Sequence, residues 1–169
     1  MPSQGKKYSN SEAFQKLMKY CAYQERCHQE VNMKLYDWGF YKDDRNEIIV
    51  RLIQENFINE ERFARAYCRG RFRQKHWGKL KIAQGLKQKG VSSKLIEIAF
   101  EEISDDEYLN TLQTILIKKS KSVKETNEFK RNSKIAYYAI SRGFESALVF
   151  DQLKLIYLLA TLDFLYFLH

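Results

Sequence analysis

Hydrophobic side chains recur along this chain with the period of an α-helix, and no long stretch alternates with the period of a β-strand. Phe14, Leu17 and Cys21 are spaced to fall on one helix face. Ser104, with a glutamate three residues later, is typical of a capping box at a helix start. Asn59, followed by two glutamates, predicts another start, because acidic residues are favoured at the positive end of the helix dipole. The pattern predicts an all-α fold.

A glycine followed by a hydrophobic residue occurs three times, as Gly39, Gly90 and Gly143, at separations of 51 and 53 residues. Aliphatic residues stand four and eight positions before each of these glycines: Leu35, Leu86, Ala139, Val31, Ile82 and Ile135. We expect each glycine to occupy the left-handed position that ends a helix, with the next hydrophobic residue packing back on that helix. The spacing therefore indicates an internal repeat.

Each repeat has room for one helix before and one after the helix that the glycine ends. We expect an elongated tandem array of three three-helix repeats, because units of this size must pack on their neighbours. The predicted boundaries are 10–57 for the first repeat, 58–103 for the basic second repeat and 104–154 for the third. Residues 155–169 form an apolar tail, expected to be a short helix on the third repeat or on a second copy. The longer third repeat predicts a flexible insert at residues 118–127.

Composition narrows the class of protein further. One proline and seven glycines among 169 residues are too few for a β-sandwich or barrel. The three cysteines (Cys21, Cys27 and Cys68) are odd in number and form no CxxC pair, which excludes a disulfide framework. The first twenty residues lack the apolar segment of a secretory signal, and no apolar run is long enough to span a bilayer. We expect a cytoplasmic protein without membrane contact.

Positive charge is concentrated in one segment. The formal net charge is +8, and residues 62–96 contain eleven lysines and arginines but no aspartate or glutamate. A second, weaker basic stretch covers residues 118–134. An ordinary soluble surface mixes both signs, so we expect the first segment to face a polyanion or an acidic protein surface. The candidate binding residues are Arg65, Arg69, Arg71, Arg73, Lys75, Trp77, Lys79, Lys81, Lys87 and Lys89.

Within this segment, Arg65, Arg69 and Arg73 are spaced to share one helix face. Trp77 has two readings. It stacks on a base or fills a pocket of a partner, or it packs on its own core at a helix junction, with Gly78 making the turn. The sequence leaves both open.

No motif for catalysis is present. The chain has no GxxxxGK[ST], GxGxxG, GxSxG or HExxH sequence and no Cys/His cluster with metal-ligand spacing. Cys27 and His28 are adjacent, so their side chains diverge on a helix. The pairs that start at Asp43 and Asp105 lie where acids favour a helix start. We expect no enzyme activity, no catalytic or metal-binding residue and no cofactor.

Two stretches of the second repeat resemble the RecX family of regulatory proteins. Residues 57–67 (FINEERFARAY) and residues 78–91 (GKLKIAQGLKQKGV) have that family's acidic helix start, Phe-Ala and a basic helix ending in Lys-Gly-hydrophobe. The first repeat matches at Arg26, Glu30, Val31 and Leu35, and the third at residues 141–144. The family's usual Leu-Asp-Asp is replaced by Ile-Asn-Glu at 58–60, and the tail has no counterpart.

The resemblance implies a tandem three-helix-repeat protein that binds the RecA recombinase and its filament. Such proteins modulate RecA, mostly by inhibiting filament extension, strand exchange and ATP hydrolysis, and they can bind DNA. On that basis we expect a monomer that binds RecA and binds single- or double-stranded DNA weakly. Two alternatives stay open: a general DNA- or RNA-binding helical-repeat protein, and a scaffold whose basic face only keeps it in solution.

Overall fold

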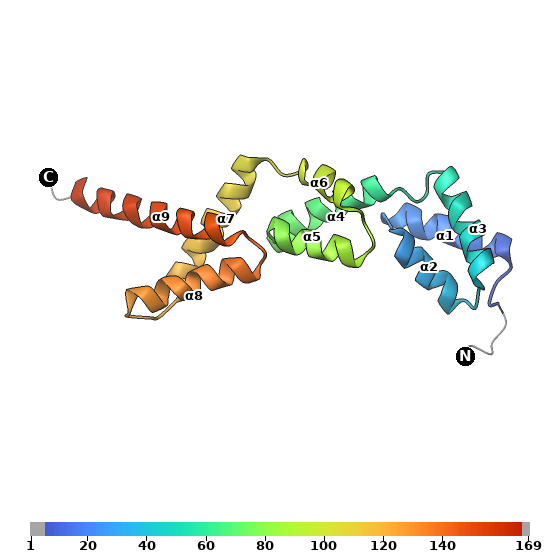
Figure 1. Ribbon diagram of the computed structural model, residues 1–169, viewed down its shortest axis with the longest axis horizontal. Coiled ribbons are helices and arrows are strands. Elements are labelled where there is room, and N and C mark those ends of the chain that lie inside the picture. The colour runs from blue at the N-terminus through green and yellow to red at the C-terminus, as the bar shows by residue number, and fades with distance from the viewer. Residues whose placement is uncertain (1–5, 167–169) are drawn as a thin grey trace. The chain divides into compact units, whose positions relative to one another are not determined.

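The computed structural model describes residues 6–166 and the side chains of residues 6–158. These residues form nine α-helices and no strand (Figure 1). The helices are α1 (Asn10–Tyr23), α2 (His28–Asp37), α3 (Lys42–Gln54), α4 (Glu60–Lys75), α5 (Lys79–Gln88), α6 (Ser93–Phe100), α7 (Asp105–Ser122), α8 (Glu128–Ser141) and α9 (Ser146–Tyr166). The prediction of an all-α helical-repeat fold is confirmed. Within the described residues, no helix combines the length and apolar character that crossing a membrane would require.

The chain divides into two compact units. The described part of unit 1 comprises residues 6–68 and 85–100, and that of unit 2 comprises residues 69–84 and 101–166. In unit 1, α1 and α2 both contact α3. The side chains of Phe14, Leu17 and Leu52 are buried there in one hydrophobic cluster. Ser9 begins α1 with a reciprocal capping box, which satisfies backbone N–H groups that have no partner inside the helix.

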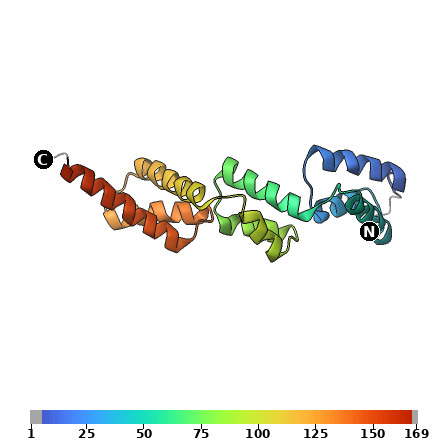
Figure 2. The same cartoon turned by 90° about the horizontal axis from the view of Figure 1, so that it is seen from above.

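In unit 2, α7, α8 and α9 contact one another and run side by side (Figure 2). A row of aromatic rings continues their core: Phe72 lies 5.9 Å from Tyr108, which lies 5.1 Å from Phe144, measured between ring centroids. The Tyr108 hydroxyl donates to Glu145 and accepts from the backbone N–H of Lys79. Burial, reinforced by the Glu145 carboxylate, raises the pKa of Tyr108, so it stays a neutral hydroxyl at neutral pH.

The three repeat glycines end their helices as the sequence predicts. Gly39, Gly90 and Gly143 have φ angles of 80°, 80° and 92°, in the left-handed region. In each turn the next residue donates its N–H to the carbonyl five positions earlier: Phe40 to Leu35, Val91 to Leu86, and Phe144 to Ala139. The aliphatic residues four and eight positions before each glycine are all buried, as are the three hydrophobic residues that follow the glycines.

Two expectations about the third repeat are wrong. Residues 118–122 are not part of a flexible insert, because they form the last turns of α7, and only residues 123–127 link it to α8. The tail is not a separate short helix, because α9 continues without a break from Ser146 through Tyr166. Apolar residues on both sides of position 154 have good helix propensity and no breaker separates them. Leu155 is 47% exposed, and the side chains beyond residue 158 lie outside the described part.

Two glycine turns meet inside unit 2. The N–H of Gly78 donates to the carbonyl of Arg142 at 2.8 Å, and the N–H of Leu80 donates to the carbonyl of Gly143 at 3.0 Å. A Cβ on Gly78 would lie 2.2 Å from the Gly143 carbonyl oxygen, and a Cβ on Gly143 would lie 2.3 Å from the Lys81 Cβ. Only glycine at both positions lets the two backbones approach this closely. The junction fixes the position of Trp77, the residue before Gly78.

Candidate functional site

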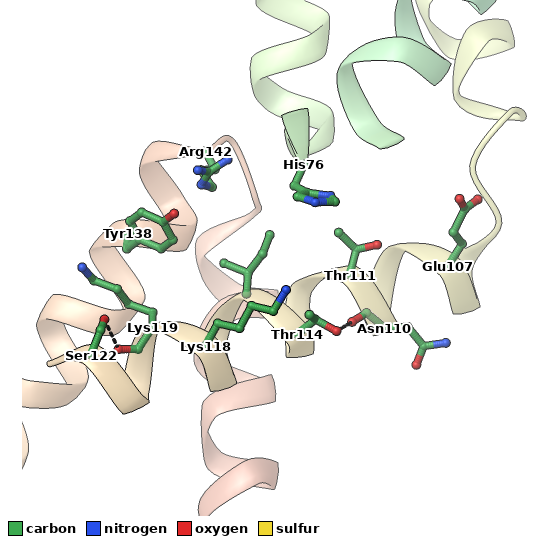
Figure 3. A pocket seen from close by; sticks show the side chains of 11 residues that line it. His76, Glu107, Asn110, Thr111, Thr114, Lys118, Lys119, Ser122, Tyr138 and Arg142 are labelled. Carbon is green, nitrogen blue, oxygen red and sulfur yellow. Dashed lines mark hydrogen bonds between the residues drawn. The ribbon is translucent and has the colours of Figure 1, made fainter. Parts of the chain in front are cut away.

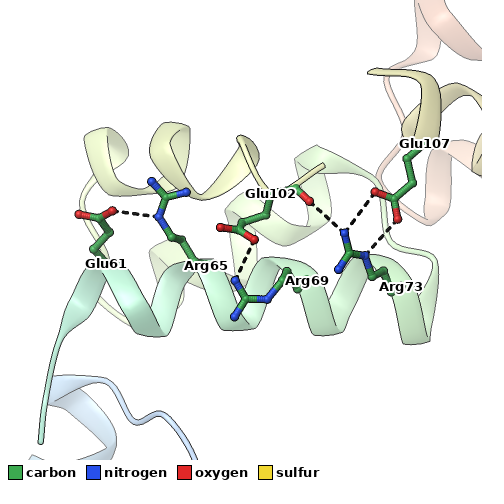
Figure 4. A network of polar contacts seen from close by, with 6 residues as sticks. All are labelled: Glu61, Arg65, Arg69, Arg73, Glu102 and Glu107. Atoms are coloured by element: carbon green, nitrogen blue, oxygen red, sulfur yellow. Dashed lines mark hydrogen bonds and ion pairs between the residues drawn. The ribbon is translucent and has the colours of Figure 1, made fainter. Parts of the chain in front are cut away.

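Three arginines of α4 are tied to carboxylates that lie outside the basic segment (Figure 4). In unit 1, Arg65 Nε lies 2.9 Å from Glu61 Oε1. In unit 2, an Arg69 amino group (Nη1) lies 2.8 Å from Glu102, and Arg73 Nε lies 3.0 Å from Glu107. These partners come from the first turn of α4, from the α6–α7 link and from α7. The shared helix face is therefore confirmed, but it is a row of ion pairs and not a row of solvated cations.

The Arg73 pair also explains an incomplete helix cap. The Ser104 hydroxyl accepts from the Glu107 N–H at 3.2 Å, as the sequence predicts. The Glu107 carboxylate binds Arg73 instead of the backbone N–H of Ser104. The second hydrogen bond of the predicted capping box is therefore not formed. Since both Arg69 and Arg73 face acids, reversing either charge would place two carboxylates together. We therefore expect such reversals to lower stability.

Trp77 lies between two cations. The Arg71 guanidinium is 5.0 Å from the indole centroid, and the Lys81 ammonium is 4.9 Å from it. The indole is half-buried, and Lys81 Nζ also donates to the carbonyl of Ser141 at 3.3 Å. We call Arg71, Trp77 and Lys81 the tryptophan cluster. The ring packs at the helix junction, as the second reading predicts, and it still presents surface flanked by positive charge, so its contact with a partner stays a prediction.

Lys79 and Lys89 are held against their own units. Lys79 Nζ lies 3.8 Å from Asp105 and 4.8 Å from the Tyr108 ring centroid. Lys89 Nζ lies 2.6 Å from Glu30. Burial alone would lower the pKa of Lys89, but the hydrogen bond and charge of Glu30 outweigh it and raise that pKa. Each lysine joins segments far apart in the sequence, which gives both a structural role.

Lys87 lines a groove of about 550 Å³ in unit 1. Two further cations line the same groove, Lys42 and Arg45 of α3, and sequence reasoning did not identify them. The charge pattern could not single them out, because Asp43 and Asp44 stand between them in the sequence. Lys75, by contrast, is exposed at the end of α4, and its carbonyl accepts from Arg142 at 2.8 Å.

A second groove, of about 740 Å³, lies in unit 2 along α7 and α8 (Figure 3). Lys118, Lys119 and Arg142 line it, together with His76, whose left-handed φ of 51° turns the chain after α4. Figure 3 shows His76 and Lys118 directed into the same opening. Sequence reasoning saw residues 118–134 only as a weaker basic stretch. It could not foresee that His76 and Arg142 join them.

Titratable groups that could do chemistry are few in the part of the chain that the structure describes. No three His, Cys, Asp or Glu side chains there are close enough together to hold a metal ion. His28 Nδ1 lies 2.5 Å from Glu60, a pairing that ties α2 to the start of α4. Cys21, Cys27 and Cys68 are buried thiols. Burial raises the pKa of Cys21 to about 11, which makes it a poor nucleophile at neutral pH.

The ten candidate binding residues divide between the two units. Arg65, Lys87 and Lys89 belong to unit 1, and the other seven belong to unit 2. Unit 2 brings together the tryptophan cluster, and it holds Arg69, Arg73 and Lys79 against acids. That these residues contact a partner stays a prediction.

Comparisons with known proteins all point to one family. A family model described as "RecX, second three-helix domain" matches residues 59–99. The chain is 30% identical over 138 residues to "Regulatory protein RecX" of Haemophilus influenzae, covering 81% of this chain and 90% of that one. It is 32% identical over 117 residues to the Pasteurella multocida protein of the same name, covering 69% and 70%.

Other relatives of that name are longer than the matched region. The match spans 61% of the Clostridium acetobutylicum relative, at 26% identity, and 37% of the Lactobacillus johnsonii relative, at 32% identity. Among solved structures, "RecX from Lactobacillus salivarius" superposes with a TM-score of 0.79 at 23% identity, covering 88% of this chain and 97% of that one. A second, titled "regulatory protein RecX", gives a TM-score of 0.76 at 21% identity, covering 84% and 71%. These structures support the helical-repeat fold.

Proposed function

The chain belongs to the RecX family of regulatory proteins, and from that premise we propose that it binds the RecA recombinase and its filament and inhibits RecA's recombination and ATPase activities. The single observation that carries this proposal is the match of 30–32% identity over most of the length of two regulatory RecX proteins. We also propose three repeats at 10–57, 58–103 and 104–154. The chain would act without catalysis, cofactor or membrane contact, as a cytoplasmic monomer.

We propose the tryptophan cluster as the part of the basic surface that contributes most to RecA binding. A half-buried aromatic ring flanked by cations has the composition of an interface hot spot, where Trp and Arg are enriched. The glycine junction holds Trp77 in place before binding, so little conformational entropy is lost on association. The paired arginines of α4 are suited to orienting the basic surface toward RecA, because Glu61, Glu102 and Glu107 already compensate their charges.

A second candidate function is general DNA or RNA binding by the same basic surface. The net charge of +8 favours it, and weak, salt-dependent DNA binding fits both candidates. The two differ in what they require. RecA regulation requires a complex with RecA protein, whereas general nucleic-acid binding requires only the polyanion.

A pull-down of purified RecA by the full chain, with and without DNA, tests the proposal. We expect RecA to be retained in both conditions and more strongly on DNA-assembled filaments. Retention that disappears after nuclease treatment would favour the general DNA- or RNA-binding reading. No retention in any condition would overturn the RecA proposal.

A further inference from the structure

The groove along α7 and α8 adjoins a second groove of unit 2. The first, of about 740 Å³, and the second, of about 560 Å³, share Lys119, Ser122 and Tyr138 as lining residues. We call the two together the α7–α8 channel. A compact small molecule would need only one of these hollows. Two adjoining hollows that share lining residues offer room for an extended ligand.

The channel carries positive charge with little compensation. Lys118, Lys119 and Arg142 line the first groove, and Lys124 and Lys134 line the second. Glu107, the one acid among these lining residues, binds Arg73, and Lys134 lies 2.7 Å from Glu125, which does not line either groove. Within residues 6–158, neither Lys118 nor Lys124 makes an ion pair. A ligand that satisfies both lysines must be anionic along its length.

Aromatic rings stand among these cations. Tyr138 is covered by Lys119 and Arg142, each 4.9 Å from the ring centroid. Tyr137, the next residue along α8, is 74% exposed and lines the second groove. An exposed ring of this kind offers a flat face on which an unpaired base can stack. Stacking requires the base to be outside a duplex.

We propose that the α7–α8 channel binds single-stranded nucleic acid, with Lys118 and Lys124 contacting phosphates and Tyr137 stacking on a base. The combination of a positively charged channel and an exposed aromatic platform favours this ligand over an acidic peptide, which would leave the Tyr137 ring unused. The channel lining contains none of the residues of the tryptophan cluster. It does not rest on the proposed RecA role, because the binding needs no RecA.

Direct binding of a fluorescein-labelled oligothymidylate to the full chain, followed by fluorescence anisotropy across a salt series, tests the site. Tyr137→Ala should weaken binding about fivefold or more, since stacking on one aromatic ring contributes ~1–3 kcal/mol per base. Phe129→Ala is the matched control, because Phe129 is also on α8, is 82% exposed and lies outside the channel lining. It should change affinity by less than about twofold.

The salt series tests the lysines. Removing two phosphate contacts in Lys118→Gln/Lys124→Gln should reduce the slope of log K against log salt by roughly 1.4, at ~0.7 per contact for single strands. The control, Lys121→Gln/Lys130→Gln, removes the same charge from exposed positions of α7 and α8 outside the channel lining and should leave the slope unchanged. Equal slopes in the two double variants would overturn the proposal. So would equal affinity for duplex DNA, displacement of the oligonucleotide by polyglutamate at equal charge, or unchanged affinity of Tyr137→Ala with its melting temperature preserved.

Discussion

Replacing Gly78 with alanine should destabilise unit 2 far more than a glycine replacement normally does. The added Cβ would lie 2.2 Å from the Gly143 carbonyl oxygen and 2.3 Å from the Phe144 nitrogen, and both contacts are with backbone that cannot rotate away. Relieving these contacts must lengthen the backbone hydrogen bonds from Gly78 to Arg142 and from Leu80 to Gly143. Overpacking costs about 1–3 kcal/mol and the two hydrogen bonds about 1 kcal/mol each, so we expect a loss of about 3–5 kcal/mol.

Two other glycines provide controls in the same chain. Gly90 has a φ of 80° but nothing within 4 Å of an added Cβ, so Gly90→Ala isolates the cost of a left-handed alanine, about 1–2 kcal/mol. Gly70 lies in α4 with open space around its Cβ, so Gly70→Ala should stabilise the chain by up to ~1 kcal/mol through helix propensity. The expected order of stability places Gly70→Ala first and Gly78→Ala last.

Urea unfolding followed by tryptophan fluorescence measures these losses in the correct unit. The chain has two tryptophans, Trp38 in unit 1 and Trp77 in unit 2. In a Trp38→Phe background, the remaining signal reports on Trp77 in unit 2, which contains Gly70 and Gly78. Gly90 lies in unit 1, so Gly90→Ala is followed through Trp38 in a Trp77→Phe background. If Gly78→Ala loses no more free energy of unfolding, relative to its own background, than Gly90→Ala does, the backbone contact contributes nothing beyond ordinary glycine replacement.

Three further predictions follow from burial and charge. Phe63→Ala should cost ~3–5 kcal/mol, because the ring is 4% exposed, and a thermal melt would show a drop of roughly 2–4 °C per kcal/mol; a change below 1 kcal/mol would contradict this burial. Arg73→Glu should lower the free energy of unfolding by up to ~1 kcal/mol, since the ion pair is partly exposed, and adding Glu107→Arg should restore that stability. A double variant no more stable than Arg73→Glu alone would count against the ion pair. Burial raises the pKa of Cys21 to about 11 from an ordinary value near 9, so the thiol should resist labelling at pH 8 until urea is added. The stability that the neutral Cys21 thiol contributes is present below pH 9 and is lost as the pH rises from 9 to about 11. A urea midpoint that does not change across that range would contradict this raised pKa.

Local patterns predicted the fold well because each repeat carries its own stop signal. The positions before Gly39, Gly90 and Gly143 are buried, and the glycines adopt the left-handed conformation that the spacing required. These features depend on residues within about two helical turns of one another. The continuous α9 was missed because a change in composition at residue 155 resembles a boundary, although nothing there breaks a helix.

The candidate site was harder to predict, because charge pairing depends on residues distant in the sequence. No inspection of residues 62–96 could show that Glu102 and Glu107 would meet Arg69 and Arg73. The α7–α8 groove was missed for the same reason, since His76 reaches it from the end of α4. Sequence gives the charge of a segment, whereas the fold decides which charges remain available to a partner.

Inhibition of RecA's ATPase on single-stranded DNA, with the full chain present in amounts well below the DNA, measures the central claim most directly. Parent and Lys94→Glu, an exposed control in the same basic segment, should inhibit equally. Trp77→Ala and Lys81→Glu should each need about tenfold more protein for the same inhibition, a loss of ~1.4 kcal/mol of binding, with folding verified by thermal melts. If both variants inhibit as well as the parent, the tryptophan cluster is not the RecA-binding surface. If the parent leaves the ATPase rate unchanged until it sequesters the DNA itself, the proposed regulation of RecA is contradicted.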